Sequence, residues 1–242
     1  MIKRFTDIFV SLVGLTIASP ILLVVSFFVW IQDFKMPFYI PLRVGKNNKQ
    51  FKMIKLRSMV VNADASGVDS TGADDVRITS IGHVIRKFKL DELTQLWNVL
   101  KGDMSLVGPR PNIITETDLY TSIERKLLTV RPGITDISSI VFSDEGDILS
   151  NIDDPDLAYN QLIRPWKSRL GIIYIDNQSL ILDIELIFMT IVAIVSKKTA
   201  LNWIAKKLKK YNVDEELIKI CKRESDLYPF PPPGSDKVVE VR

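Results

Sequence analysis

Two adjacent acids, Asp91 and Glu92, are the residues of this 242-residue sequence best suited to chemistry. They open the helical pattern of the stretch KLDELTQLWNVLKGDMSLVGPRP. A plain alternative is that they only cap the helix, because free amides in a first turn stabilise carboxylates by about 0.3–1 kcal/mol. Neighbouring helical residues point about 100° apart, so the two side chains do not face each other along the helix, but they could still converge if the helix begins at Asp91.

The scarcity of histidine and cysteine removes most other catalytic schemes. The sequence has one histidine, His83, and one cysteine, Cys221, so neither an intrachain disulfide nor a Cys/His zinc cluster can form. A Ser-His-Asp triad would need His83, and a Cys-His pair would have to join it to Cys221 in the polar tail. Carboxylates, lysines and tyrosines remain as acids, bases or nucleophiles.

Basic residues surround the acid pair in the sequence. Upstream, the segment QFKMIKLRSM predicts a short strand over residues 50–59 with one cationic side, which suits a diphosphate or an ordinary solvated face. A guanidinium in the GPRP turn matches the geometry of phosphate. Basic residues within twenty positions of the pair include Arg86, Lys87, Lys89, Lys101 and Arg110.

This combination suits phosphoryl transfer, in which a protein mainly positions groups and neutralises charge. An aspartate can serve as the covalent nucleophile of such a reaction. A second carboxylate can hold Mg²⁺, which also lets two acids tolerate a diphosphate. The residues alone therefore predict an enzyme that handles phosphates.

An apolar segment near the N-terminus indicates a membrane. Residues 8–31, IFVSLVGLTIASPILLVVSFFVWI, form an uncharged helical run that is about long enough to cross a bilayer core. This run accounts for a high mean hydropathy of +0.13 in a chain with 25% charged residues. A signal peptide is the weaker alternative, because the run is too long and no small-residue cleavage site follows it.

The dipeptide Ser19-Pro20 interrupts the middle of this run. Proline lacks an amide and clashes with the preceding turn, while the serine hydroxyl can satisfy the freed carbonyl. Positive charge lies before the run, at Lys3 and Arg4, and after it over residues 35–57, so the positive-inside rule places both flanks in the cytoplasm. A helix broken at Ser19-Pro20 that enters and leaves on one face satisfies both observations. An ordinary kinked helix that crosses the bilayer is the alternative.

Other segments are assigned by periodicity and composition. Two short helices should meet at 89–91, a further helix should cover 116–128, and a mobile loop should cover 62–75. Residues 179–195 are apolar but too short and too charged for a comfortable span. Residues 197–211 suit an interfacial helix on anionic lipid, or an ordinary surface helix with a basic face. A Pro-rich, extended tail follows.

The stretch around the acid pair closely resembles the signature of bacterial sugar transferases, the monotopic phosphoglycosyl transferases. Further matching motifs, in the family's order, are KRFTDIFVSLVGLTIASPILL, PLRVGKNNKQFKMIKLRSM, TSIGHVIRK and RPGIT. The resemblance implies a mostly helical α/β fold in a minimal catalytic form, on the cytoplasmic face of a bacterial inner membrane. The parts expected are a re-entrant membrane helix over 1–33, a cytosolic catalytic domain over 34–198, and a basic amphipathic helix with a Pro-rich tail over 199–242.

The resemblance also implies a reaction. A sugar 1-phosphate passes from a nucleotide diphosphosugar, usually a UDP-sugar, to polyprenol phosphate such as undecaprenyl phosphate, and nucleoside monophosphate is released. Asp91 would attack the β-phosphate to form an aspartyl phosphosugar, and Glu92 would bind Mg²⁺ or position charge. The basic residues at matching positions, expected to contact the diphosphate, are Lys55, Arg57, Arg86, Arg110 and, as a weaker candidate, Arg131.

Some features leave alternatives. Asp136 stands where many relatives have the second glycine of PGITG, so the region after Arg131 is expected to shape sugar or nucleotide choice. The tail from Thr199 matches no family motif and could dock on anionic lipid or join two copies as a homodimer. A catalytically silent, membrane-bound scaffold or regulator is the alternative function, which the intact LDEL and GPRP motifs disfavour. Nucleic acid is excluded as a partner, because a net charge of +3 is too low.

Overall fold

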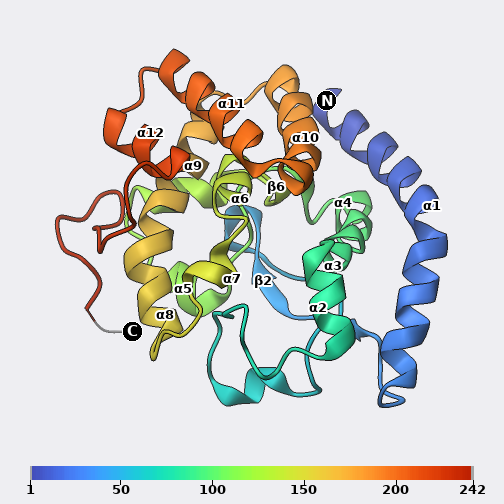
Figure 1. Cartoon of the computed structure of the whole chain (residues 1–242). Coiled ribbons are helices and arrows are strands. Elements are labelled where there is room, and N and C mark those ends of the chain that lie inside the picture. The colour runs from blue at the N-terminus through green and yellow to red at the C-terminus, as the bar shows by residue number, and fades with distance from the viewer. Residues whose placement is uncertain (1, 241–242) are drawn as a thin grey trace.

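The computed structural model describes residues 2–240 and opens with one long helix, α1 (Ile2–Ile31). Among the described residues, α1 alone is long and apolar enough to cross a membrane, and little of its apolar stretch is buried. It runs as an arc along one side of the molecule, and the rest of the chain lies inside the arc (Figure 1).

The middle of α1 bends without interruption. The helical backbone continues through Pro20, so the break expected at Ser19-Pro20 is instead a bend within one helix (Figure 1). Pro20 has no amide to offer the carbonyl of Thr16, four residues earlier. The hydroxyl of Ser19 donates to that carbonyl at 2.9 Å, as the sequence predicted, and so compensates for the missing bond.

Short strands follow α1 and form three two-stranded sheets among the described residues. The strand expected over 50–59 is split into two strands with different partners. The pairs are β1 (Phe38–Tyr39) with β4 (Lys55–Leu56), antiparallel, β2 (Leu42–Val44) with β3 (Gln50–Lys52), antiparallel, and β5 (Ser105–Val107) with β6 (Gly133–Thr135), parallel.

Helices make up most of the remaining chain. The loop expected over 62–75 contains only one 3₁₀ turn, η2 (Ala63–Ser66). The other 3₁₀ helices of the described residues are η1 (Lys46–Asn48) and η3 (Glu124–Thr129), and η4 (Tyr159–Ile163) is a π-helix. The α-helices after α1 are α2 (Ser80–Lys87), α3 (Leu90–Leu93), α4 (Leu96–Lys101), α5 (Ile114–Asp118), α6 (Ile137–Val141), α7 (Glu145–Ile148), α8 (Pro155–Ala158), α9 (Arg164–Asp176), α10 (Leu180–Val195), α11 (Lys197–Lys210) and α12 (Glu215–Lys222).

The single helix predicted over 116–128 is wrong. The chain forms α5 and then η3, because Thr121 and Glu124 begin a new helical turn between them. The Glu124 amide donates to the Thr121 hydroxyl at 3.1 Å, and the Glu124 carboxylate accepts from the Thr121 amide at 3.0 Å. This reciprocal pair is a capping box, and its sequence T-x-x-E is readable in advance.

Charged residues fix the first turns of α1 to the folded domain. Arg4 donates to the carbonyls of Val99 and Leu100, in the last turn of α4, at 2.6 and 2.9 Å. The buried carboxylate of Asp7 accepts from the Ser105 hydroxyl at 2.9 Å and the Leu106 amide at 3.1 Å, both in β5. The N-terminal end of the apolar helix is therefore part of the domain rather than a free anchor.

The main hydrophobic core lies between β5, α6, α9, α10 and α11. The apolar face of α11, with Leu201, Ile204 and Leu208, is buried in this core. That placement favours the surface-helix alternative over an apolar face in lipid, and contact of the lysines with anionic lipid stays a prediction. On α10 the inner side chain Leu186 is fully buried, whereas Phe188 on the outer face is 59% exposed.

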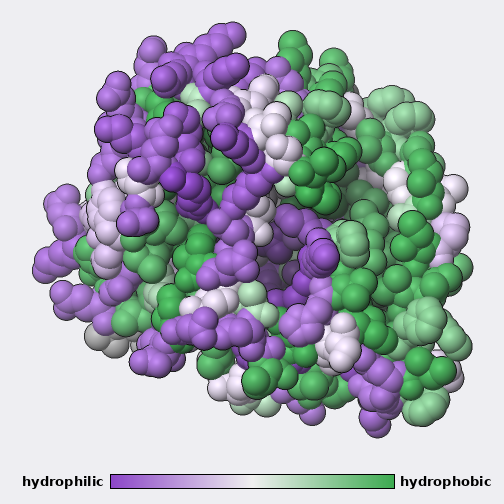
Figure 2. Space-filling model, in the orientation of Figure 1, coloured by the Kyte–Doolittle hydropathy of each residue, from purple (hydrophilic) through white to green (hydrophobic). Residues whose placement is uncertain are grey.

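The surface divides into apolar and polar regions. Hydrophobic residues cover the side formed by α1 and the outer face of α10, while hydrophilic residues cover α11 and α12 (Figure 2). Between them, hydrophilic side chains line a hollow in the middle of the face shown (Figure 2).

The Pro-rich tail is extended, as predicted, and it packs on the domain. Phe230 stacks on Trp166 with ring centroids 4.4 Å apart, and Pro232 and Pro233 are buried. The Phe230 amide donates to the carbonyl of Gln161 at 3.1 Å. Residues 223–240 therefore form a strap across α9.

The two faces of α10 should respond differently to truncation. Leu186→Ala should lower the free energy of unfolding in detergent micelles by about 2–5 kcal/mol, because it leaves a cavity in the core. Phe188→Ala should change it by less than about 0.5 kcal/mol, because its side chain packs on little protein. Equal losses in chemical denaturation would show that the outer face of α10 is also core.

Candidate active site

The acid pair lies in the first turn of α3, directly after Leu90. Lys89 has a left-handed backbone (φ 51°, ψ 33°), which ends α2 and starts α3 in a new direction. The side chains of Asp91 and Glu92 are each 15% exposed. No backbone amide of the described residues is recorded as donating to either carboxylate, so simple capping does not account for them.

Each acid faces a cation from a distant segment. The Lys55 Nζ lies 3.7 Å from Oδ2 of Asp91. The Arg110 Nη1 donates to Oε1 of Glu92 at 2.9 Å. The structure thus brings together four of the residues predicted from the sequence.

Two buried polar side chains position Lys55 beside Asp91. The Thr94 hydroxyl donates at 2.9 Å to the carbonyl of Ile54, the residue before Lys55. The Asn98 side chain accepts from the Ile54 amide at 2.9 Å and donates to the Lys52 carbonyl at 2.7 Å. These bonds hold the backbone where the chain passes from β3 to β4, and so they fix Lys55 against α3. Sequence reasoning missed both residues, although Asn98 interrupts an apolar helical face.

A close backbone contact positions Arg110. The motifs GPRP and RPGIT lie side by side, with the Gly108 amide donating to Thr135 and the Gly133 amide to Pro109, both at 3.0 Å. A Cβ added to Gly133 would lie 2.1 Å from the amide nitrogen of Gly108, so only glycine fits there. This contact fixes the turn that presents Arg110 to Glu92.

Burial and charge act together on the ionisable groups. Burial lowers the pKa of Lys55 below its ordinary value of 10.5, although Asp91 opposes the shift. Burial alone would raise the pKa of Glu92, but Arg110, Lys89 and Lys55 outweigh it and hold that pKa below its usual range. Glu92 in turn raises the pKa of Arg110. At neutral pH the site therefore holds ionised Glu92 among cations.

Further cations adjoin the pair. Arg86 donates to the Ser58 hydroxyl at 3.2 Å, and burial lowers its pKa while the charge of Asp91 opposes that shift. Lys89 acts on Glu92, and Arg43 acts on Arg110, through their charges. Arg43 and Lys89 were not predicted as site residues. Cations thus outnumber the two carboxylates, so the site attracts an anion.

Arg57 and Arg131, also predicted to contact the diphosphate, are placed elsewhere. Arg57 is 6% exposed and its guanidinium is bound to Asp33, beyond the end of α1. Arg131 is exposed, and its Nε donates to the Gly102 carbonyl, after α4, at 2.9 Å. No recorded contact of the described residues joins either arginine to the acid pair.

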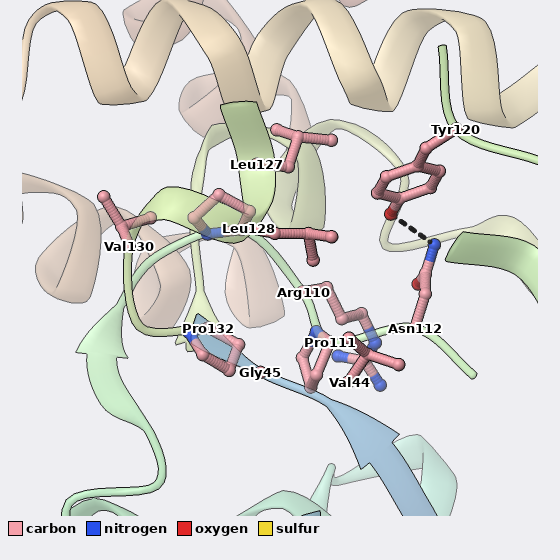
Figure 3. Close-up of a pocket in the computed structure, with 11 residues that line it drawn as sticks. Val44, Gly45, Arg110, Pro111, Asn112, Tyr120, Leu127, Leu128, Val130 and Pro132 are labelled. Carbon is pink, nitrogen blue, oxygen red and sulfur yellow. Dashed lines mark hydrogen bonds between the residues drawn. The ribbon is translucent and has the colours of Figure 1, made fainter. Parts of the chain in front are cut away.

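A small pocket is lined in part by Arg110 (Figure 3). Val44, Pro111 and Asn112 lie around its guanidinium, and Asn112 donates to the Tyr120 hydroxyl at 3.0 Å. A second pocket shares Arg110 and Asn112 and is lined also by Asp136, Tyr159 and Lys167.

Asp136 is buried at the start of α6, where its carboxylate accepts from the Ser139 amide at 2.7 Å. Burial raises its pKa above the usual range. The departure from the family pattern noted at this position thus lies beside the pocket that Arg110 shares.

The donor set for a metal ion is small. The described residues contain no cluster of three or more His, Cys, Asp or Glu side chains that could hold a metal. Asp91 and Glu92 supply two adjacent carboxylates, and Mg²⁺ commonly binds one or two carboxylates together with substrate phosphates and waters. The acid pair therefore fits Mg²⁺ only if a phosphate substrate completes its ligands.

Comparison with known proteins gives consistent results. The family model described as "Bacterial sugar transferase" matches residues 1–197. The chain is 35% identical over 196 residues to the UDP-N-acetylgalactosamine-undecaprenyl-phosphate N-acetylgalactosaminephosphotransferase of Aeromonas hydrophila, covering 78% of this chain and 43% of that protein. It is 33% identical to the exopolysaccharide production protein ExoY of Sinorhizobium fredii, covering 79% of this chain and 84% of that protein.

A third relative is the UDP-glucose:undecaprenyl-phosphate glucose-1-phosphate transferase of Klebsiella pneumoniae, 33% identical over 78% of this chain and 39% of that protein. The chain thus spans less than half the length of two of these three relatives. The described part that lies beyond the match comprises α11, α12 and the tail strap.

At neutral pH, the buried charge of Lys55 should lower the free energy of unfolding of the protein. Lys55→Met should raise the free energy of unfolding at pH 7 by about 0.5–2 kcal/mol, because it removes a charge whose burial is unfavourable. Since the folded pKa of Lys55 is lowered, this penalty is complete below that pKa and fades as pH rises towards 10.5. Denaturation curves should therefore show the gain shrinking in alkali.

The matched control for that measurement is Lys101→Met. The Lys101 side chain is 52% exposed, so its replacement should change stability by less than about 0.5 kcal/mol. A loss of stability in Lys55→Met at pH 7 would contradict the account of its burial.

Proposed function

Because this chain belongs to the bacterial sugar transferase family, we propose that it transfers a sugar 1-phosphate from a UDP-sugar to polyprenol phosphate. The observation that carries the proposal is the pairing of Asp91 with Lys55 and of Glu92 with Arg110, among surplus cations. Relatives named for UDP-sugars and undecaprenyl phosphate support these substrate classes. The product would be a polyprenyl diphosphosugar, made in a first membrane step of polysaccharide or glycoconjugate synthesis.

Asp91 is the proposed nucleophile. One of its carboxylate oxygens forms a bond to the β-phosphorus, and the bond from that phosphorus to the bridging oxygen breaks, releasing nucleoside monophosphate. A phosphate oxygen of the polyprenol phosphate then attacks the same phosphorus and frees Asp91. Splitting the transfer this way lets one site serve a polar donor and a lipid acceptor in turn.

The cations supply the electrostatic part of catalysis. Lys55, Arg86 and Arg110 would contact the diphosphate and stabilise the charge that moves onto the leaving phosphate. The fold already sets Lys55 beside the proposed nucleophile, with its Nζ 3.7 Å from Oδ2 of Asp91. These groups are fixed by the fold, so little reorganisation is needed during transfer.

Glu92 is proposed to hold Mg²⁺ together with Asp91. A bound Mg²⁺ would neutralise charge on the diphosphate. Glu92 is suited to this role because its pKa is held low and only its Oε1 is recorded as paired, with Arg110.

We also propose that α1 is re-entrant and that the catalytic domain lies on the cytoplasmic face of the inner membrane. A straight helix of 30 residues would be about 45 Å long and would carry its ends to opposite sides of a bilayer. Yet Arg4 at one end and the residues after Ile31 at the other both bind the same folded domain. The domain boundaries at residues 33 and 198 stay predictions.

Membrane contact would extend beyond α1. The exposed apolar face of α10 continues the apolar surface, and the lysines of α11 suit anionic headgroups. Homodimer formation through the tail stays a prediction. The intact cluster around Asp91 argues against a catalytically silent scaffold.

The proposal predicts turnover that depends on Asp91. Purified protein with a panel of UDP-sugars, Mg²⁺ and undecaprenyl phosphate should release UMP, and Asp91→Asn should lower kcat about a thousandfold or more. Asp176→Asn, which changes a half-exposed carboxylate paired with Lys126, should retain nearly full activity. Absence of nucleoside monophosphate across a broad nucleotide-sugar panel, or full turnover by Asp91→Asn, would refute the function.

Mg²⁺ binding can be measured without turnover. Mg²⁺ with UDP should raise the Tm of the wild type by about 5 °C or more at saturation, since ligands stabilise the folded state they bind. EDTA should remove the part of this Tm shift that depends on Mg²⁺. In Glu92→Gln, that EDTA-sensitive part should be at most half as large as in the wild type. An equal EDTA-sensitive shift in both proteins would exclude Glu92 as a ligand.

A further inference from the structure

The guanidinium of Arg57 binds the end of α1 and the segment that follows it. Its Nη1 and Nη2 bind the two carboxylate oxygens of Asp33 at 2.5 and 2.7 Å. Its Nε donates to the Met36 carbonyl at 2.9 Å, and Nη2 also approaches the Val29 carbonyl at 3.4 Å. All three nitrogens therefore hold the last turn of α1 and the segment that leaves it, in the paired geometry that fixes direction as well as distance.

Arg57 is joined equally closely to the active site. It follows Lys55 by two positions in an extended segment, and its amide donates to the Pro37 carbonyl at 2.8 Å. Arg57 directly follows β4, the strand that carries Lys55. A shift of the Arg57 clamp would therefore move the backbone that carries Lys55.

A small hydrophobic cluster also joins the end of α1 to the segments that carry the active-site residues. Its buried members are Val29 of α1, Leu56 of β4 and Ile85 of α2, and Leu90 packs against it. Three of these are chain neighbours of charged site residues, because Leu56 follows Lys55, Ile85 precedes Arg86, and Leu90 precedes Asp91. This cluster is separate from the main core, so the membrane helix, rather than the main core, supports this side of the site.

We propose that Arg57 is a positioning residue, which with Asp33 ties the exit of the membrane helix to β4 and so holds Lys55 against Asp91. The proposal rests on the function proposed above, in which Lys55 acts on Asp91 and the diphosphate. It makes catalysis depend on how the end of α1 sits at the membrane surface. Arg57 itself touches neither substrate nor the acid pair.

Kinetics separate this role from a purely structural one. Arg57→Lys and Asp33→Asn should each lower kcat about tenfold, with KM for the UDP-sugar within about twofold, because displaced groups slow chemistry more than binding. In a Lys55→Gln background, Arg57→Lys should lower kcat by less than about twofold, since it acts through Lys55. Unchanged kcat in both single variants, or the same factor with and without Lys55, would overturn the proposal.

The matched control is Arg223→Gln. Arg223 also binds a carboxylate, Asp144, at 2.8 Å and a carbonyl, that of Val141, at 3.0 Å, but it lies in the tail strap. This variant should keep the wild-type kcat even if its Tm falls as much as that of Arg57→Lys. A loss of kcat in Arg223→Gln that matches its loss of Tm would show that general destabilisation explains both arginines.

A readout without turnover keeps the proposal testable if the proposed function fails. Mass spectrometry can follow amine-reactive labelling of Lys55 in folded protein in lipid nanodiscs. Labelling should be several-fold faster in Arg57→Lys than in the wild type, while labelling of the exposed Lys101 is unchanged. Equal labelling rates for Lys55 would overturn the positioning role, whereas a wild type without UMP release refutes only the function.

Discussion

The arrangement of the site depends on pairing two neighbouring, mostly buried carboxylates with cations from distant segments. Asp91 and Glu92 follow each other in one helical turn, and each faces a cation of its own. The chain supplies these from segments on either side of the pair, Lys55 before it and Arg110 after it. Much of the local structure serves this pairing, from the bonds of Asn98 to the glycine contact behind Arg110. The surplus of cations then makes the same site attractive to a diphosphate.

Both ends of the membrane helix are bound to the segments that form the active site. Arg4 and Asp7 bind the segments that follow the acid pair, and Asp33 binds the segment that carries Lys55. Charged groups at the two ends of the apolar helix thus have partners within the domain. Without these partners, their charges near lipid would be energetically unfavourable. The bend at Pro20 lets one helix reach both attachments, and the exposed apolar surface between them faces away from the domain.

Local signals in the sequence predicted much of this, and long-range pairing explains what they missed. The acid pair, the apolar helix with its serine bond at Pro20, and the helix end at Gly102 all depend on residues close in sequence. The partner of Arg57 is 24 residues away, so charge pattern alone could not tell a buried clamp from a phosphate ligand. Thr94 and Asn98 pair with backbone some 40 residues earlier, which no local pattern reveals. The break between α5 and η3 was readable from a capping box.

The central claim is that Asp91 becomes bonded to the phosphorus of an activated sugar. The most direct measurement is intact-protein and peptide mass spectrometry after brief exposure to UDP-sugar and Mg²⁺ without polyprenol phosphate. The account predicts a mass increase of one phosphosugar on the peptide that contains Asp91, which disappears when undecaprenyl phosphate is added. A phosphosugar on another residue, or turnover by an enzyme that never carries one, would contradict it.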